Sequence, residues 1–391
     1  MRFELTDEQK ELQLEIRSYL EEQITDELLE EQKDDMNGPL WKQYIHNLGK
    51  DGWLGIGWPE NFGGQGKTPL EQYIFLEEIN RTGVTIPFIT LETVGPTLMD
   101  IGTEEQKEYF LPKILRGELE ISIGYTEPGA GTDLAAVETT AVKDGDDYII
   151  NGQKVFTTNA QISDYIWLAA RTDQDVRKHK GISIFLVPSD TPGISITPTS
   201  LMGEGKNTVG TNSTFYDNVR VSKDALVGEE NKGWGYITAQ LSLERLMLST
   251  YSMMERVVNE TAEWAKNTVI DGLRVIDNPW VKNDLAELTV KIEVLRLLNY
   301  RAAWSHGNSD ELPFRPSMNK AYAAELNQEV YDACMKVIGL QSQLTTDSKW
   351  SELDGKLQVF SQSYLVYLFG GGANDVMLDL VARFGLNLPR A

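Results

Sequence analysis

Gly124-Tyr-Thr-Glu-Pro-Gly-Ala-Gly-Thr-Asp133 is the segment around which this chain is organised. Its proline and two central glycines disfavour helix and strand, so the segment is expected to form an irregular loop. Such a loop can turn backbone N–H groups toward a ligand, and Thr126 and Thr132 add hydroxyls that both donate and accept hydrogen bonds. A Gly-rich loop alone is more often a plain connection than a binding site.

A second segment, Asn151-Gly-Gln-Lys-Val-Phe-Thr-Thr-Asn159, follows the first. Asn151-Gly152 predicts a turn, and the residues from Gln153 to Thr158 predict a strand. Together the two segments favour a cradle for a flat, polar cofactor that carries phosphate. Their order and spacing are far more specific than either segment alone.

The composition is that of an ordinary soluble protein with a large core: 391 residues, of which 41% are hydrophobic and 24% are charged. The 36 Lys and Arg residues against 59 Asp and Glu residues give a net charge of −23. This balance argues against nucleic acid or an anionic membrane as a partner, because both require basic patches.

Cysteine and histidine are scarce in this sequence. Cys334 is alone, and His46, His179 and His306 show no ligand spacing, so neither a disulfide framework nor a metal site is expected. The amino-terminal residues carry no signal-peptide pattern, and no apolar stretch approaches membrane-spanning length. The expected location is the cytoplasm.

Three regions of the chain differ in their pattern. The first and last carry the periodicity of amphipathic helices, whereas the middle carries short β-branched and aromatic runs separated by turn residues. Thr6 and Thr103 each begin a capping box, which marks a helix start. The sequence therefore predicts an α+β protein with a helical domain at 1–118, an all-β sandwich or barrel at 119–229 and a helical bundle at 230–391.

Within the last region, long helical segments are expected at roughly 232–267, 278–306 and 317–340. Glu244 interrupts the apolar stripe of the first segment. The stripe consists of Trp234, Ile237, Leu241, Leu248 and Tyr251. A carboxylate there is costly unless it is paired or functional, and desolvation raises its proton affinity toward the range of a general base. On this pattern alone, a structural ion pair and a catalytic base both stay open.

The two loop segments resemble those of the acyl-CoA dehydrogenase family, flavoenzymes that desaturate acyl-CoA thioesters, and the resemblance runs the whole chain. It is also carried by Asp51-Gly-Trp-Leu-Gly55, Pro59 to Gly66, Gly228-Glu-Glu-Asn-Lys-Gly-Trp234, Leu243-Glu-Arg-Leu246, the glycines at 370–372 and Leu388-Pro-Arg390. A subgroup, the hetero-oligomeric members that act on steroid side chains, is indicated by Ser122-Ile-Gly-Tyr, Asp146-Asp-Tyr, Lys178-His-Lys-Gly-Ile-Ser and Phe369-Gly-Gly-Gly. The resemblance implies a β domain against a helical bundle, with FAD between them.

The resemblance also implies that Glu244 is the base for the thioester α-proton. Most members of the family take their base from the carboxyl-terminal segment, at the position of Gly371, which has no side chain to act. A minority places it on the helix at the Leu-Glu-Arg motif. The backbone N–H of Gly371 could still donate to the thioester carbonyl. Asp375 is the nearest acid, and it is the weaker candidate because it matches a flavin-side contact.

Further contacts follow from the same resemblance. The residues that match flavin contacts are Tyr125, Thr126, Gly131, Thr132, Phe156, Thr158, Gly371 and Asp375. Thr132 and Arg245 match substrate contacts, and Arg245 also matches a pair with Glu127 that bridges loop and helix. Phe156 stands where the family commonly has Trp, which keeps an aromatic face and loses the indole N–H.

The carboxyl-terminal region departs from the family's pattern for the dinucleotide end of FAD. Arg274 remains, but neither Phe-Gly nor Gln follows at the expected distance. Ala373 replaces a Thr, and Met377-Leu378 replaces a Gln-Arg pair. A homologous partner subunit in an α2β2 assembly could supply the missing contacts, and a homo-oligomer is the alternative.

The sequence thus predicts an FAD-dependent acyl-CoA dehydrogenase that acts on a bulky or branched acyl-CoA, with a steroid side chain as one candidate. Electrons are expected to pass to an electron-transfer flavoprotein. Two alternatives stay open. One is a non-catalytic subunit that stabilises a paralogue, which the absent carboxyl-terminal base favours, and the other is a flavin oxidase of the same fold.

Overall fold

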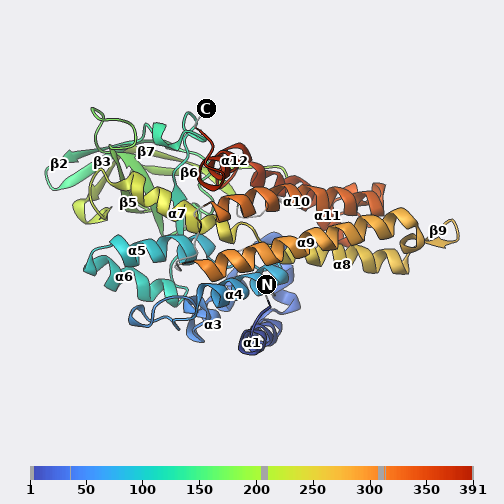
Figure 1. The fold of residues 1–391 in the computed structure, drawn as a ribbon. Coiled ribbons are helices and arrows are strands. Elements are labelled where there is room, and N and C mark those ends of the chain that lie inside the picture. Colours follow the sequence, from blue (N-terminus) through green and yellow to red (C-terminus); the bar gives the residue numbers. More distant parts are fainter. Residues whose placement is uncertain (1–3, 36, 204–209, 307–311, 313, 390–391) are drawn as a thin grey trace.

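Helices form both ends of the chain and strands form its middle, as the computed structural model shows (Figure 1). The expected three-part α+β architecture is therefore confirmed. The described residues are 4–35, 37–203, 210–306, 312 and 314–389, with the side chains of 33–34 and 242–247 excepted.

The amino-terminal region is a set of helices whose starts are capped by side chains. Thr6 Oγ1 accepts from the backbone N–H of Gln9 at 3.2 Å, and Thr103 Oγ1 accepts from that of Gln106 at 3.2 Å. Both predicted capping boxes are thus confirmed. The helices are α1 Asp7–Gln23, α2 Asp26–Asp34, α3 Pro39–Lys50, α4 Pro69–Thr82, the π-helix η3 Thr90–Val94, α5 Gly95–Ile101 and α6 Glu104–Leu115.

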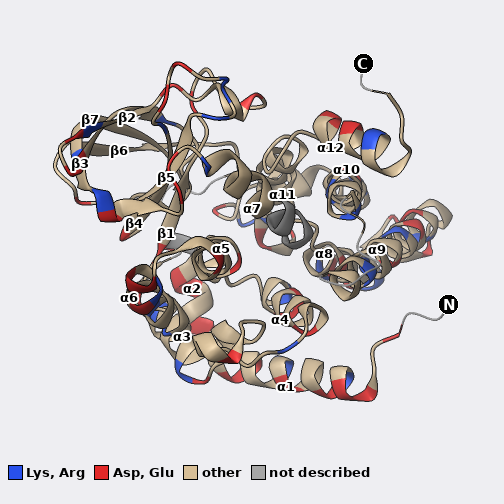
Figure 2. Cartoon of the chain, turned by 60° about the vertical axis from the view of Figure 1, so that its left-hand side comes forward, with Lys and Arg blue, Asp and Glu red and all other residues tan. Residues whose placement is uncertain are grey.

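The middle region is one mixed sheet in the order β6-β7-β3-β2-β4-β5-β8, with β1 added parallel to β4. Its strands are β1 Ile121–Gly124, β2 Thr140–Asp144, β3 Asp147–Lys154, β4 Tyr165–Arg171, β5 Ile182–Pro188, β6 Ile194–Thr199, β7 Thr211–Ser222 and β8 Leu226–Val227. The sheet curls around a core of its own (Figure 2). Ile166 and Leu168 of β4 lie in that core, whereas Trp167 and Ala169 lie in the core shared with the helices.

The predicted turn at Asn151-Gly152 is wrong, because both residues lie within β3. The pairing of β3 with β7 shifts register between Ile150 and Gly152, which is a β-bulge. Gly152 has a φ of 151°, and a Cβ there would lie 2.4 Å from Thr139 Oγ1. The asparagine-glycine pair therefore serves a bulge inside a continuous strand, and the strand ends at Lys154.

The carboxyl-terminal region is a bundle of long helices (Figure 1). Its elements are α7 Gly233–Met247, α8 Ser252–Asn267, β9 Val269–Ile270, β10 Leu273–Arg274, α9 Pro279–Ser305, α10 Arg315–Ile338, α11 Lys356–Ser363, the 3-10 helix η9 Tyr364–Leu368, α12 Asn374–Leu380 and the π-helix η10 Val381–Gly385. The helices expected at roughly 278–306 and 317–340 are α9 and α10. The single helix expected at roughly 232–267 is wrong, since it is broken into α7 and α8.

A buried carboxylate accompanies this break. Glu77 of α4 accepts hydrogen bonds from the backbone N–H groups of Tyr251 (3.2 Å) and Ser252 (3.1 Å), where α8 begins. The Tyr73 hydroxyl also donates to Glu77, and burial raises the pKa of this carboxyl to about 7. A side chain from the amino-terminal region therefore caps a carboxyl-terminal helix.

Acidic residues, coloured red in Figure 2, are spread over several helices. Within the described residues, none of the helices has both the length and the apolar character needed to cross a membrane.

Replacing Gly152 by Ala should destabilise the protein by about 2–4 kcal/mol, because the side chain would need an unfavourable backbone and would strike Thr139. The matched control is Gly235→Ala in α7, where an added Cβ meets no atom within 4 Å. Thermal unfolding followed by circular dichroism should show a lower Tm for Gly152→Ala only. Equal Tm values for the two variants would contradict the bulge.

Candidate active site

The loop that follows β1, residues 125–133, is called the β1 loop, and its first side chain holds it in place. The Tyr125 ring is buried, its hydroxyl donates to Gln240 Oε1 of α7, and it accepts from the Trp167 indole N–H at 2.8 Å. Glu127 and Ala130 exchange two backbone hydrogen bonds of 3.1 Å, which close the loop into a tight turn. The Tyr125 side chain therefore fixes the loop to α7 and β4.

A buried ion pair ties this loop to β3. Lys154 Nζ lies 2.7 Å from Glu127 Oε1 and donates to Tyr125 O at 3.0 Å, while Glu127 accepts from the backbone N–H of Thr139 at 2.9 Å. Burial lowers the pKa of Lys154 to about 8. Burial also acts to raise the pKa of Glu127, but the Lys154 cation and the surrounding donors bring that pKa below its usual value, so the pair is ionised at neutral pH.

The predicted pair between Glu127 and Arg245 concerns a side chain outside the described residues, as does the predicted base Glu244. Among the described side chains the cation at Glu127 is Lys154, which the sequence analysis did not single out. A signal for this pair was visible in the sequence. Side chains alternate between the two faces of a strand, and Lys154 lies on the same face of β3 as the buried Tyr148 and Ile150.

The far side of the loop is open. Gly131 and Thr132 are exposed, and a Cβ placed on Gly129 or Gly131 would meet no atom within 4 Å. Crowding within this chain therefore does not explain these glycines, whereas the close approach of another molecule would. Thr126, half-buried, connects the open part of the loop to the anchored Tyr125.

Phe156 lies beside this loop with an unusual backbone. The Val155 N–H donates to Thr126 O at 2.9 Å and the Thr157 N–H donates to Asn212 O at 2.9 Å, so the segment is fixed on both sides. Phe156 has a φ of 58° and leaves 56% of its side chain exposed. A left-handed aromatic residue costs about 1–3 kcal/mol, and such strain gathers at functional sites.

Neither Phe156 nor Thr158 lies on a strand, contrary to the prediction, because β3 ends before both of them. Thr158 is exposed in the turn that follows. The hydrogen bond from the Val155 N–H to Thr126 O nevertheless holds the segment that contains both residues beside the β1 loop.

Helix α7 joins the β1 loop to the carboxyl-terminal glycines. Gln240, which is buried, accepts from Tyr125 and donates to Thr93 O of η3 at 3.4 Å. Two turns further on, Leu248 lies against Gly371, where a Cβ would come within 2.5 Å of Leu248 Cδ1. Residue 244 follows Gln240 and precedes Leu248 by about one helical turn each.

Gly371 and Gly372 form a left-handed turn before α12. Their φ angles are 65° and 103°, a region that side chains disfavour. Together with the contact to Leu248, this explains in physical terms why position 371 carries no carboxylate. Asp375 lies exposed in the first turn of α12.

The π-helix η3 packs against α7 and contains a second buried acid. Glu92 is 7% exposed, and its described hydrogen bond comes from the Gln72 amide at 2.5 Å. Burial raises the pKa of Glu92 to about 8, so the carboxyl is protonated at neutral pH. The sequence analysis missed Glu92, although an acid inside the apolar run at 86–94 was a visible signal.

Arg274, predicted as the remaining dinucleotide contact, pairs instead with Asp277 Oδ2 at 2.8 Å. Met377, a residue of α12, is completely buried. Among the described residues, Gln240 of α7 contacts the β1 loop, and Leu248, just after α7, contacts the glycine turn.

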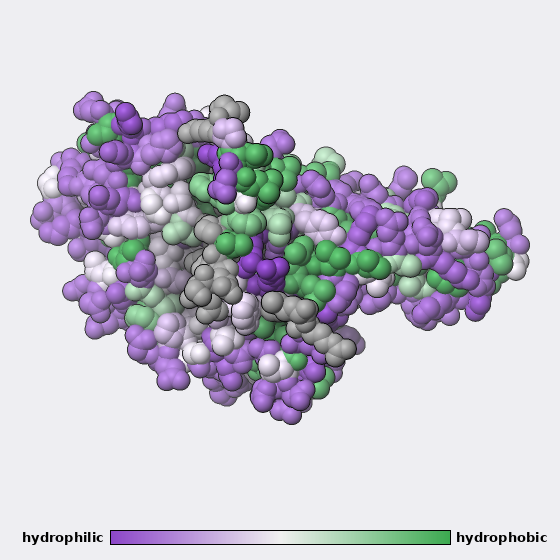
Figure 3. Space-filling view, viewed as in Figure 1, coloured by the Kyte–Doolittle hydropathy of each residue, from purple (hydrophilic) through white to green (hydrophobic). Residues whose placement is uncertain are grey.

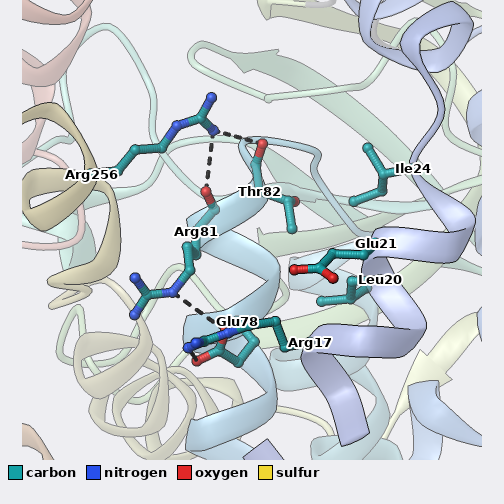
Figure 4. A pocket seen from close by; sticks show the side chains of 8 residues that line it. All are labelled: Arg17, Leu20, Glu21, Ile24, Glu78, Arg81, Thr82 and Arg256. Carbon is teal, nitrogen blue, oxygen red and sulfur yellow. Dashed lines mark hydrogen bonds and ion pairs between the residues drawn. The ribbon is translucent and has the colours of Figure 1, made fainter. Parts of the chain in front are cut away.

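One pocket of the described structure lies away from the β1 loop, mainly in the amino-terminal helical region. A cavity of about 360 Å³ lies between α1, α4 and α8 (Figure 4). Its arginines are already paired: Arg17 with Glu78 at 2.9 Å, and Arg81 with Glu255 at 2.8 Å. No group of His, Cys, Asp and Glu within the described residues could hold a metal ion.

Comparison with protein families matches the amino-terminal, middle and carboxyl-terminal domains of acyl-CoA dehydrogenase at residues 6–118, 122–219 and 231–386. This chain belongs to the acyl-CoA dehydrogenase family. The resemblance stated from the sequence is confirmed, and with it an enzyme that acts on CH–CH groups.

Several relatives are similar over the whole length. The acyl-CoA dehydrogenases FadE26 and FadE29 of Mycobacterium tuberculosis are 42% identical over 402 residues and 43% identical over 390 residues. Both alignments cover 100% of this chain, and they cover 100% and 99% of the relatives. The ChsE4-ChsE5 complex from Mycobacterium tuberculosis matches with a TM-score of 0.92 and 42% identity, and the Tcur3481-Tcur3483 steroid ACAD with 0.93 and 41%, each over 100% of both chains.

As an acyl-CoA dehydrogenase the enzyme uses FAD. The residues present fit a flat ring system that carries phosphate. An exposed aromatic side chain, Phe156, lies beside a loop whose glycines are open to approach and whose Thr132 hydroxyl is exposed.

The protonated Glu92 makes stability depend on pH. Its folded pKa of about 8 lies above the ordinary value of 4.5, so its contribution is fully present below pH 4.5 and is lost as the pH rises through 8. Glu92→Gln stays neutral and should escape this loss. Between pH 5 and pH 8.5 the wild type should lose at least about 1 kcal/mol more than the variant.

Denaturant unfolding across this pH range measures the difference. Exposed Glu229→Gln is the control, and it should follow the wild type. Parallel curves for Glu92→Gln and the wild type would contradict a neutral buried carboxyl.

Proposed function

We propose that this chain catalyses the FAD-dependent α,β-dehydrogenation of an acyl-CoA thioester with Glu244 as the base. The observation that carries the proposal is the position of residue 244 along α7. It follows Gln240, which is bonded to the β1 loop, and precedes Leu248, which contacts Gly371. A residue at this point of the helix stands between the two segments that match the family's flavin and thioester contacts.

The reaction requires a base that takes the α-proton and a hydrogen-bond donor that stabilises the thioester carbonyl oxygen. A thioester α-proton is weakly acidic, so it must be removed where water is excluded and where donors stabilise the carbonyl oxygen as negative charge develops. We assign the α-proton to the Glu244 carboxylate and the carbonyl oxygen to the backbone N–H of Gly371. FAD, when bound, supplies the acceptor for the β-hydrogen.

The residues proposed to contact the cofactor are those assigned from the sequence, and only the role of Tyr125 is refined. Tyr125 is proposed to contribute backbone atoms, since its hydroxyl is occupied by Gln240 and Trp167. The other proposed cofactor contacts are Thr126, Gly131, Thr132, Phe156, Thr158, Gly371 and Asp375. Thr132 and Arg245 are proposed to contact the substrate.

The substrate is proposed to be a bulky or branched acyl-CoA such as one with a steroid side chain. The similarity to a steroid acyl-CoA dehydrogenase at 41% identity over the full length supports this class. An electron-transfer flavoprotein is the proposed acceptor, as in the family at large.

Glu244→Gln should slow flavin bleaching by substrate at least about 1,000-fold, because the amide cannot accept the α-proton. The measurement is anaerobic stopped-flow absorbance of the flavin-loaded enzyme with a steroidal and a short straight-chain acyl-CoA. Glu255→Gln on the neighbouring helix α8 is the control, and it should keep the wild-type rate. Unimpaired bleaching in Glu244→Gln would exclude this residue as the base.

We further propose that the enzyme works with a homologous partner subunit. Two similar solved structures are complexes of two different chains. Arg274 pairs with Asp277 at the surface, and neither the Phe-Gly nor the Gln expected for the dinucleotide end of FAD follows it. Hydrophobic side chains also gather over α12 (Figure 3). Those exposed in this region are Leu365, Val366, Phe369, Leu378, Phe384, Leu386 and Leu388.

The double change Phe384→Asp with Leu386→Asp should weaken the complex at least about tenfold, since it introduces charge into an apolar surface. These side chains are 63% and 67% exposed, so folding should be unaffected. Light scattering of the co-purified chains reports the assembly, and flavin absorbance reports its occupancy. Leu14→Asp, on a residue that is 60% exposed in α1, is the control. Full flavin occupancy in the chain purified alone would contradict the partner.

A non-catalytic role beside an active paralogue is the second candidate. The left-handed Gly371, which bars a carboxylate at the position used by most of the family, favours it. The Glu244→Gln experiment separates the two, because a purely structural subunit would leave bleaching by the complex unchanged.

A further inference from the structure

A lysine inside the helical bundle, on a helix that also packs against α7, contacts the glycine turn. Lys320 of α10 is 1% exposed. Its Nζ donates to Gly372 O at 2.6 Å and to Asn374 Oδ1 at 3.2 Å. The Asn374 amide returns to α10 by donating to Ala321 O at 3.4 Å. Charge-assisted hydrogen bonds of this kind are the strong ones in proteins.

The turn that Lys320 holds follows a backbone hydrogen bond from the Gly370 N–H to Val366 O at 2.6 Å. Gly371 and Gly372 have left-handed φ angles of 65° and 103°, and glycine permits many other conformations. Leu248 lies against Gly371, and Lys320 donates to the carbonyl of the next residue. Leu248 and Lys320 therefore constrain two consecutive residues of the turn, Gly371 and Gly372.

Burying an ammonium group is expensive, so a lysine at this position indicates a task that an apolar residue cannot perform. A methionine would fill the same space but would leave Gly372 O without this donor. The task that the geometry identifies is to fix the Gly372 carbonyl and, with it, the shape of the glycine turn.

We propose that Lys320 is a positioning residue for the reaction. It holds the turn at 370–374 so that the Gly371 N–H faces the thioester carbonyl opposite α7. The inference rests on the proposed function, because it assigns the use of that N–H. Lys320 itself touches neither substrate nor cofactor in this assignment, and it acts through Gly372 and Asn374.

The first test reads the turn directly, without turnover. Hydrogen exchange with mass spectrometry on the flavin-loaded enzyme should show exchange at least fivefold faster across 366–377 in Lys320→Met. Peptides from the middle of α10 should keep their wild-type rate. Asn374→Ala removes one acceptor at a half-buried position and should give a smaller acceleration in the same peptides, so it decides the matter if Lys320→Met fails to fold.

The second test separates positioning from stability. Either variant should lower kcat at least fivefold while KM for the acyl-CoA stays within threefold, since binding is kept and stabilisation of the carbonyl oxygen is lost. Lys336→Met is the matched control on the same helix, because Lys336 is exposed and pairs with Asp284 at 2.8 Å. It should match the wild type in both measurements.

The outcomes are distinguishable. Faster exchange together with an unchanged kcat would overturn the positioning role and leave a structural one. Unchanged exchange together with an unchanged kcat would show that the Lys320 contact to Gly372 neither orders the turn nor supports the reaction. If none of the acyl-CoA substrates bleached the flavin of the wild-type complex, the proposed function would be refuted instead. The exchange measurement would still report whether Lys320 orders the turn.

Discussion

The candidate active site depends on the buried ion pair between Lys154 and Glu127. Each charge would be strongly unfavourable in the core without the other, so the pair forces β3 and the β1 loop into one arrangement. Backbone donors and acceptors on both segments complete the coordination, among them Tyr125 O and the Thr139 N–H. A loop rich in glycine would otherwise sample many shapes, and here it is as fixed as the strand beside it.

Helix α7 extends this fixed arrangement into the rest of the protein. Gln240 links it to the β1 loop and to η3, and Leu248 links its end to Gly371. The next helix begins on Glu77, a residue of the amino-terminal region. Contributions from all three regions therefore meet on one helix, which is why the site cannot be assembled from any region alone.

Local signals in the sequence were sufficient for features that local contacts determine. The capping boxes at Thr6 and Thr103 are examples, as are α9 and α10. The bulge at Gly152 could not be foreseen, because its cause is the distant Thr139. The break before α8 and the ion pair at Lys154 could not be predicted for the same reason, because the residues that interact there lie far apart in the chain. The loop residues of the site came from family resemblance rather than from periodicity, and their roles remain predictions.

The left-handed Gly371 beside Leu248 has a consequence for how this family diversifies. A carboxylate at this point would meet a disfavoured backbone conformation and the terminal methyl group of the leucine. Positions 248 and 371 should therefore vary in concert across homologous sequences, with a smaller residue at the first wherever an acid occupies the second. Relocating the proton acceptor between helix and loop would then require coupled substitutions rather than a single exchange.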